Sequence, residues 1–268
     1  MDVNAYLQRI NYRGSLAATA QTLQQLQLAH LLTVPFENLS IHSAEPIIIN
    51  DDALFEKIVV RRRGGFCYEL NGLFAALLRE LGFEVAMLSA GVANAEGIFG
   101  PDFDHMTLLV TIKEDGLLVR WLADVGFGDS FRQPLLLDAR EEQTQGIRTY
   151  KIAEHKPHLI MMQRQAGDEW KAQYRFTLQP HAYADYSEMC RYHQTSPQSH
   201  FTRARVCTRA TPEGRITLSE MRLITTTHDN GRQERLLTND VEYASILKEQ
   251  FGIEMNSGAQ ASLPADGA

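Results

Sequence analysis

The sequence is poor in cysteine and has no excess of positive charge. Its 268 residues include three cysteines, none in a CxxC pair, and carry a formal net charge of −7. Three thiols without such a pair indicate a reducing compartment, so we expect a cytoplasmic protein. A nucleic acid or an anionic membrane would require a surplus of Lys and Arg, so we expect neither as a partner.

Several motifs are also missing. The sequence has no apolar run near the roughly 18 residues that a membrane helix needs, and its start lacks the basic and apolar regions of a secretion signal. It contains no HExxH pair, no Cys/His cluster with zinc spacing, no P-loop and no strand-linked GxGxxG. We therefore expect no metal site. The 44% hydrophobic content is ordinary for a globular protein with a sizeable core.

The most informative stretch is RRRGGFCYELNGLF at 61–74. After its cysteine, apolar residues recur at spacings of three and four as far as Leu81, and Gly82 follows as a stop signal. This pattern predicts an amphipathic helix that begins at Cys67.

The surroundings of Cys67 favour a nucleophile. Gly64 and Gly65 allow a close backbone approach, and the N–H groups of a first helical turn carry partial positive charge. Both features predict an exposed thiol with a lowered pKa. The alternative is a small buried core residue, which is how we interpret Cys190 and Cys207 because neither follows such a turn.

A hairpin supplies the groups that a thiol nucleophile needs. Strand-like runs at 105–112 and 117–125 flank the turn KEDG. A loop of residues 114–115 places His105 directly opposite Asp124, and a loop of 115–116 places the two diagonally on the same face. A three-residue loop would separate them unless a bulge restored the parity. On the opposite face, four residues are predicted to be core: Met106, Leu108, Val110 and Ile112.

Cys67, His105 and Asp124 together indicate thiol-dependent acyl transfer, with His105 as base and Asp124 as its partner. Each residue also has an ordinary interpretation. His105 could be a polar residue at a strand start, and Asp124 could cap the turn at Gly126. The combination of all three is what favours catalysis.

We predict an α+β fold in three parts. Residues 1–82 form a helical bundle that carries the nucleophile, with helices near Tyr6, from Ser15, and from Asn50. Residues 83–180 form an antiparallel, barrel-like β-domain that carries His105 and Asp124. Residues 181–255 form an α/β lid ending in a helix at 240–251, and 256–268 form a polar tail that we expect to be disordered.

The sequence resembles the bacterial arylamine N-acetyltransferases, including the N-hydroxyarylamine O-acetyltransferases. Five segments carry the resemblance, in the order of that family: VPFENL at 34–39, RGGFCYELN at 63–71, FDHM at 103–106, DVGFGD at 124–129 and SPQSHF at 196–201.

The resemblance implies a catalytic core like those of transglutaminases and cysteine proteases, with Cys67 as acetyl acceptor. It implies acetyl-CoA as donor, a ping-pong cycle, and a small aromatic amine, hydrazine or hydroxylamine as acceptor. It also implies a structural ion pair between Glu37 and Arg63. The implied acceptor site is lined by Gly126 and by Phe36, Phe127 and Phe201, and the three phenylalanine rings could equally be ordinary core.

Three alternatives remain open at this point. The same residues could serve a transglutaminase-like or peptidase-like hydrolase, or an amide synthase that uses another acyl thioester. A third interpretation is a binding module in which Cys67 is structural. The exposed edges of a β-domain would also allow a homodimer.

Overall fold

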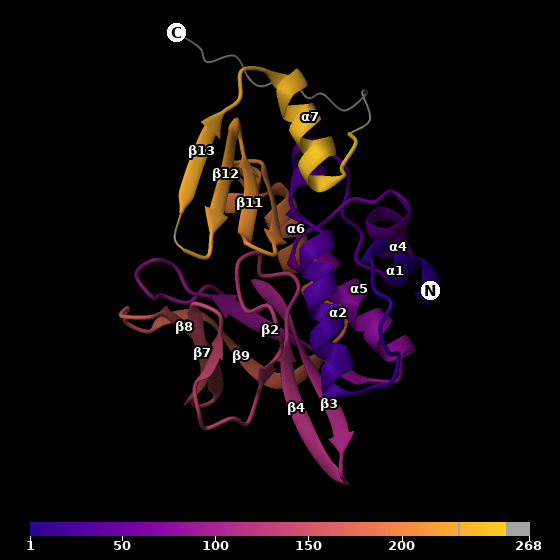
Figure 1. Cartoon of the computed structure of the whole chain (residues 1–268), viewed down its shortest axis with the longest axis vertical. Coiled ribbons are helices and arrows are strands. Elements are labelled where there is room, and N and C mark those ends of the chain that lie inside the picture. The colour runs from indigo at the N-terminus through magenta and orange to yellow at the C-terminus, as the bar shows by residue number, and fades with distance from the viewer. Residues whose placement is uncertain (230, 256–268) are drawn as a thin grey trace.

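The chain folds into a group of N-terminal helices, an eight-stranded sheet and a five-stranded sheet, and both sheets are antiparallel (Figure 1). The computed structural model describes residues 1–229 and 231–255. The disordered tail predicted at 256–268 lies outside the described residues. No helix in the described part of the chain is long and apolar enough to cross a membrane.

The helices of the first part follow local capping signals. The helix predicted from Ser15 instead begins at Ala20, because the Thr19 side chain accepts the Thr22 N–H at 3.2 Å and so fixes the start. The elements are α1 (Val3–Arg9), α2 (Ala20–Thr33), α3 (Leu39–His42), α4 (Asp51–Phe55), the π-helical turn η1 (Glu56–Val60) and α5 (Cys67–Glu80).

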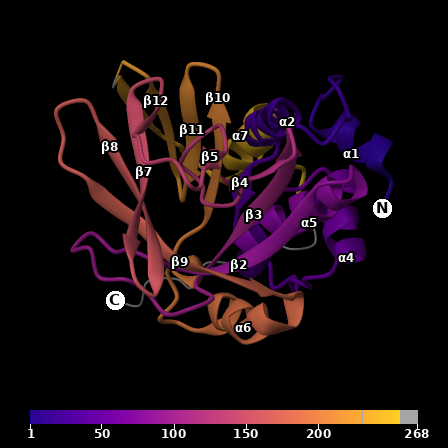
Figure 2. The same ribbon diagram turned by 90° about the horizontal axis from the view of Figure 1, so that it is seen from below.

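Helix α5 is the centre of this part of the protein. It begins at Cys67 as predicted, and every residue from Cys67 to Leu78 is buried, so the more polar face of the helix is covered as well as its apolar face. The helix packs against β2 and β3 on one side and against α1 and α4 on the other (Figure 2). The residues at its start therefore lie inside the protein rather than at a surface.

The eight-stranded sheet has the order β5-β4-β3-β2-β9-β8-β7-β6. Its central hairpin pairs Glu114 with Leu117, so the loop is Asp115–Gly116, and both loop residues have positive φ as a type I′ turn requires. The four predicted core residues of this hairpin are buried. The strands are β2 (Glu84–Val92), β3 (His105–Glu114), β4 (Leu117–Ala123), β5 (Leu135–Leu136), β6 (Gln143–Gln145), β7 (Arg148–His155), β8 (His158–Gln165) and β9 (Lys171–His181).

Two glutamine side chains join the ends of this sheet. Gln143 on β6 accepts the Leu136 N–H of β5 at 2.7 Å and donates to the Leu136 carbonyl at 3.0 Å. Gln145 accepts the N–H groups of Arg132 and Gln133 and donates to the Gln133 carbonyl at 2.8 Å. Each glutamine side-chain amide thus makes hydrogen bonds that the backbone of a neighbouring strand would otherwise make. The sheet is nearly closed, in agreement with the predicted barrel-like domain.

The five-stranded sheet has the order β1-β10-β11-β12-β13 and packs on α7, whose predicted limits are confirmed. Sequence analysis missed β1 and β13. Because β1 comes from the N-terminal part, the sheet of the predicted lid is not built from C-terminal residues alone. The domain limits predicted from the sequence remain a prediction. The elements are β1 (Phe36–Glu37), η2 (Tyr183–Tyr186), α6 (Ser187–Thr195), η3 (His200–Thr202), β10 (Val206–Thr211), β11 (Gly214–Ser219), β12 (Arg222–Thr227), β13 (Arg232–Leu236) and α7 (Asp240–Phe251).

A buried histidine joins three of the helices. His30 on α2 is fully buried, its Nδ1 forms a 2.9 Å hydrogen bond with the Tyr6 hydroxyl, and its ring lies edge-on to Phe74. Burial, with a further contribution from Arg9, lowers the pKa of His30 to about 3. The folded protein therefore keeps His30 neutral where an unfolded chain would protonate it.

We expect His30 to make the free energy of unfolding fall as the pH drops below about 6.5. Between about pH 6.5 and pH 3 the unfolded chain binds a proton that folded His30 does not, which destabilises the fold by up to about 1.4 kcal/mol per pH unit. His30→Phe should lose this contribution in urea unfolding across that range. The exposed His155→Phe is the control and should keep the wild-type slope; an unchanged slope in His30→Phe would contradict the assignment.

Candidate active site

The carboxylate of Asp124 is buried and fully hydrogen-bonded. Its Oδ2 lies 2.7 Å from Nε2 of His105, so the predicted pairing of these residues is present, in the diagonal arrangement. Its Oδ1 accepts the Gly126 N–H and the Asn71 side-chain N–H, each at 2.9 Å. The strand that carries His105 and the loop after β4 are thereby fixed to helix α5.

Asn71 is a site residue that sequence reasoning missed. Besides Asp124, its Nδ2 donates to the Met106 carbonyl at 2.6 Å, and its Oδ1 accepts the Val125 N–H at 2.8 Å. The signal was available, because Asn71 lies one helical turn after Cys67 on the same face, and an amide inside an apolar helix needs partners.

Cys67 is the first residue of α5 and is only 3% exposed. Burial raises the pKa of its thiol, while a hydrogen bond from the Met106 backbone, next to His105 in the chain, lowers that pKa in part. The expectation of an exposed thiol with a lowered pKa is therefore wrong. The physical reason is that α5 begins inside the protein, so desolvation outweighs the favourable helix start.

Three glycines allow the close approaches around Cys67. A Cβ on Gly64 would lie 2.0 Å from the Pro35 carbonyl oxygen, and a Cβ on Gly65 would lie 2.7 Å from Cβ of Glu69. A Cβ on Gly126 would lie 2.8 Å from Cα of Cys67. The predicted close backbone approach at the Gly-Gly turn is thus present, and Gly126 lies against the backbone of the thiol residue.

Two buried ion pairs hold the segment that precedes Cys67. Arg63 lies 2.8 Å from Glu37, the ion pair that the resemblance implied, and Lys57 lies 2.6 Å from Glu69. Although burial alone would raise it, Lys57 and Arg63 hold the pKa of Glu37 below its ordinary value. Glu69 also accepts the N–H of Phe66 at 3.1 Å, which caps the start of α5.

The predicted pocket aromatics fall into two groups. Phe127 lies edge-on to His105 with 5.2 Å between ring centroids, and Tyr174, which sequence analysis missed, lies 5.3 Å from the same imidazole. Phe36 lies 6.1 Å from Phe201. Phe127 therefore contacts the candidate base, while Phe36 and Phe201 form a separate aromatic pair.

The loop that bears Phe201 is held by buried polar groups. Asn38 donates to the Phe201 carbonyl at 2.8 Å, and the Ser199 hydroxyl accepts the Phe201 N–H at 3.2 Å. His193 bonds Ser199 through Nδ1 and lies 3.2 Å from Asp104, the neighbour of His105. The position of Phe201 is thus connected to the start of β3.

Within the described residues, no group of three or more His, Cys, Asp or Glu side chains is arranged to hold a metal ion. The groups that could perform chemistry are a thiol at a helix start, an imidazole and a carboxylate that orients the imidazole. Such a set can form and break an acyl-enzyme intermediate.

Comparisons with known proteins identify related chains. A family model described as N-acetyltransferase matches residues 19–260. "Arylamine N-acetyltransferase" of Escherichia coli K12 is 33% identical over 94% of this chain and 88% of its own length. "Arylamine N-acetyltransferase / N-hydroxyarylamine O-acetyltransferase" of Salmonella typhimurium LT2 is 32% identical over 95% and 89%. The solved structure of Mycobacterium marinum arylamine N-acetyltransferase in complex with CoA is 31% identical, covers 94% of this chain and 93% of its own, and has a TM-score of 0.85.

Gly126→Ala should destabilise the protein by about 2–3 kcal/mol, because the added methyl group would overlap the backbone of Cys67, which cannot move freely. Urea unfolding measures the loss. Gly14→Ala is the matched control, since its methyl group would meet only the side-chain ends of Tyr12 and Gln25. Equal stability of the two variants would show that the loop after β4 does not pack on α5 as described.

Proposed function

Because this chain belongs to the arylamine N-acetyltransferase family, we propose that it transfers an acetyl group from acetyl-CoA to an aromatic amine, hydrazine or N-hydroxyarylamine. The proposed cycle is ping-pong, with an acetyl group held on Cys67. The observation that carries this proposal is the buried 2.7 Å contact between His105 and Asp124, fixed through Asn71 to the helix that begins at Cys67.

In the first half-reaction, His105 takes the proton of the Cys67 thiol on Nδ1, since Nε2 is held by Asp124. Burial disfavours a lone thiolate, so the charge pair with the imidazolium is the form in which the thiol ionises. The thiolate then attacks the thioester carbonyl, and free backbone N–H groups at the start of α5 stabilise the oxyanion. The C–S bond to CoA breaks, and His105 returns its proton to the leaving thiolate.

In the second half-reaction, the acceptor nitrogen, or the oxygen of an N-hydroxyarylamine, attacks acetyl-Cys67. His105 removes the proton of the attacking group, and the bond between the acetyl carbon and the Cys67 sulfur breaks. We propose that Phe36, Gly126, Phe127 and Phe201 line the acceptor site. Edge-on contact of Phe127 with His105 would place a flat ring beside the base.

Mixing the protein with acetyl-CoA alone should place one acetyl group on Cys67. Rapid quenching followed by peptide mass spectrometry detects it, and adding an arylamine should remove it. Cys67→Ala should abolish the modified peptide, while the control Cys190→Ala should leave it unchanged. If no acetyl group forms although Cys67 still reacts with alkylating agents, the donor is a different acyl compound or a peptide, as a hydrolase or amide synthase would require.

Alkylation of Cys67 should depend on His105 in a pH-dependent way. Burial raises the pKa of the Cys67 thiol, and in the wild-type protein the imidazolium of His105 offers the thiolate a partner that offsets part of this cost. In His105→Ala that partner is missing, so the alkylation midpoint of Cys67 should move to higher pH than in the wild type. Iodoacetamide labelling at several pH values, read per peptide, measures this shift.

Cys190 provides an internal control in the same samples, because burial raises the pKa of its thiol to about 12. Its labelling should stay slow in both proteins. If the alkylation of Cys67 has the same pH profile in the wild type and in His105→Ala, His105 is not the base that ionises the thiol.

A further inference from the structure

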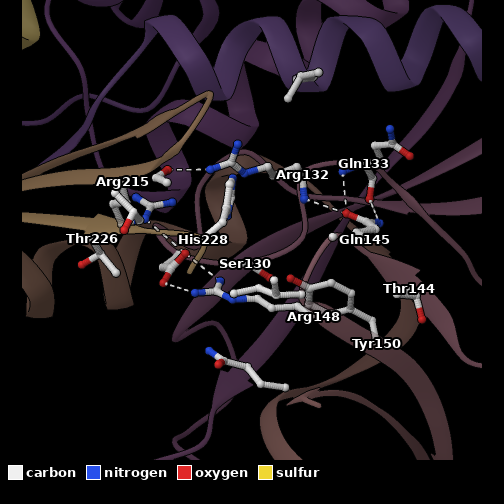
Figure 3. A pocket seen from close by; sticks show the side chains of 17 residues that line it. Ser130, Arg132, Gln133, Thr144, Gln145, Arg148, Tyr150, Arg215, Thr226 and His228 are labelled. Atoms are coloured by element: carbon white, nitrogen blue, oxygen red, sulfur yellow. Dashed lines mark hydrogen bonds and ion pairs between the residues drawn. The ribbon is translucent and has the colours of Figure 1, made fainter. Parts of the chain in front are cut away.

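A cavity of about 470 Å³ lies where the eight-stranded sheet meets the five-stranded sheet. Its wall combines the loop after β4, the start of β7 and the strands β11 and β12, and Figure 3 shows Arg132, Arg148 and Arg215 reaching into it from three of these elements. We call it the arginine cavity. Cys67, His105 and Asp124 are not among its lining residues.

The charges of the arginine cavity are unbalanced. Among its described lining residues, Asp129 is the one carboxylate that faces three guanidinium groups. Arg148 takes both oxygens of Asp129 at 2.7 and 2.8 Å, and Nε of Arg215 lies 3.1 Å from the same carboxylate. Arg132 donates to the Gly214 carbonyl at 2.5 Å and is attracted by Asp129 without an ion-pair contact, and more weakly by Glu213, which is exposed on a turn outside the cavity. Two positive charges are therefore in excess.

One polar group of the cavity also lacks a partner. Within the described chain, the hydroxyl of Ser130 is buried without a hydrogen bond. Burial lowers the pKa of both Arg132 and Arg215, and repulsion from Arg148 adds to this. Partly buried like charges and a buried hydroxyl without a partner are costly for a protein alone, and a bound anion would relieve both.

We propose that the arginine cavity binds the phosphate groups of the acetyl donor. This inference rests on the proposed function, since that function makes CoA the substrate. Phosphate oxygens match the forked donors of arginine, and a ligand with several phosphates offsets more than one excess charge. The cavity is also of the size that holds a small-molecule ligand.

The location of the arginine cavity favours the phosphates of the donor, rather than the carboxylate of an acceptor, as its ligand. Asp129 and Ser130 follow Phe127, which packs on His105, so the cavity lies beside the active site rather than over Cys67. In acetyl-CoA the pantetheine arm separates the thioester from the phosphates, which must therefore bind at a distance from the thiol. In an aminobenzoate one benzene ring separates the amine from the carboxylate, which would have to bind close to His105.

The test compares two donors that differ in their phosphates, acetyl-CoA and S-acetylpantetheine, by following acylation of Cys67 without an acceptor. In Arg132→Gln the acetyl-CoA concentration for half-maximal acylation should rise about tenfold or more, as expected when a charged hydrogen-bond partner is lost. Acylation by S-acetylpantetheine should be unchanged, which also shows that the variant is folded. Added salt should weaken acetyl-CoA binding in the wild type and less so in the variant.

Arg164→Gln is the matched control, because Arg164 is a half-buried arginine on β8 that pairs with Glu142 and does not line the cavity. It should behave as the wild type with both donors. If Arg132→Gln leaves the acetyl-CoA concentration for half-maximal acylation unchanged, or raises this concentration equally for both donors, the cavity does not bind the phosphates. If it instead raises the KM for 4-aminobenzoate but not for aniline, the cavity belongs to the acceptor. If neither donor acylates the wild type, the proposed function fails before the cavity is tested.

Discussion

The buried carboxylate of Asp124 is the constraint on which the rest of the site depends. A charge removed from water must be paired and hydrogen-bonded, and here the partners come from His105 on β3, Asn71 on α5 and the backbone of Gly126. Satisfying one side chain therefore fixes the distance between a helix and a hairpin. Position 126 requires glycine because the loop after β4 lies directly on the backbone of Cys67, where a Cβ would not fit. Fold stability and site geometry thus have a common physical cause.

Much of this arrangement was accessible from the sequence where the information is local. The parity of a two-residue loop placed His105 and Asp124 on one face, and the positive φ values at Asp115 and Gly116 show which register the hairpin takes. Helix α7 was predicted with its observed limits, because Asn239 caps its start and Gly252 ends it. These features depend on neighbouring residues, so periodicity and turn chemistry suffice to predict them.

The features that were missed depend on contacts between distant segments. Strand β1 pairs with β10, more than a hundred residues later, and Asn38 reaches the chain at Phe201 and Val206. The burial of Cys67 follows from packing around all sides of α5, which a helical pattern alone does not reveal. Likewise, Arg132, Arg148 and Arg215 are isolated in the sequence and meet only after two sheets have formed. Long-range packing decides such features, and one sequence contains little signal for it.

The glutamines that join β5 to β6 have a consequence for the behaviour of the protein in concentrated solution. An open sheet presents free N–H and C=O groups along its outer strands, and these can pair with another chain and start aggregation. Gln143 and Gln145 occupy several of these groups with their own amides. The sheet thereby gains the colloidal protection of a closed barrel without the strand length that full closure would need. Since this protection depends on two side chains, it can be lost by substitutions that leave every strand intact.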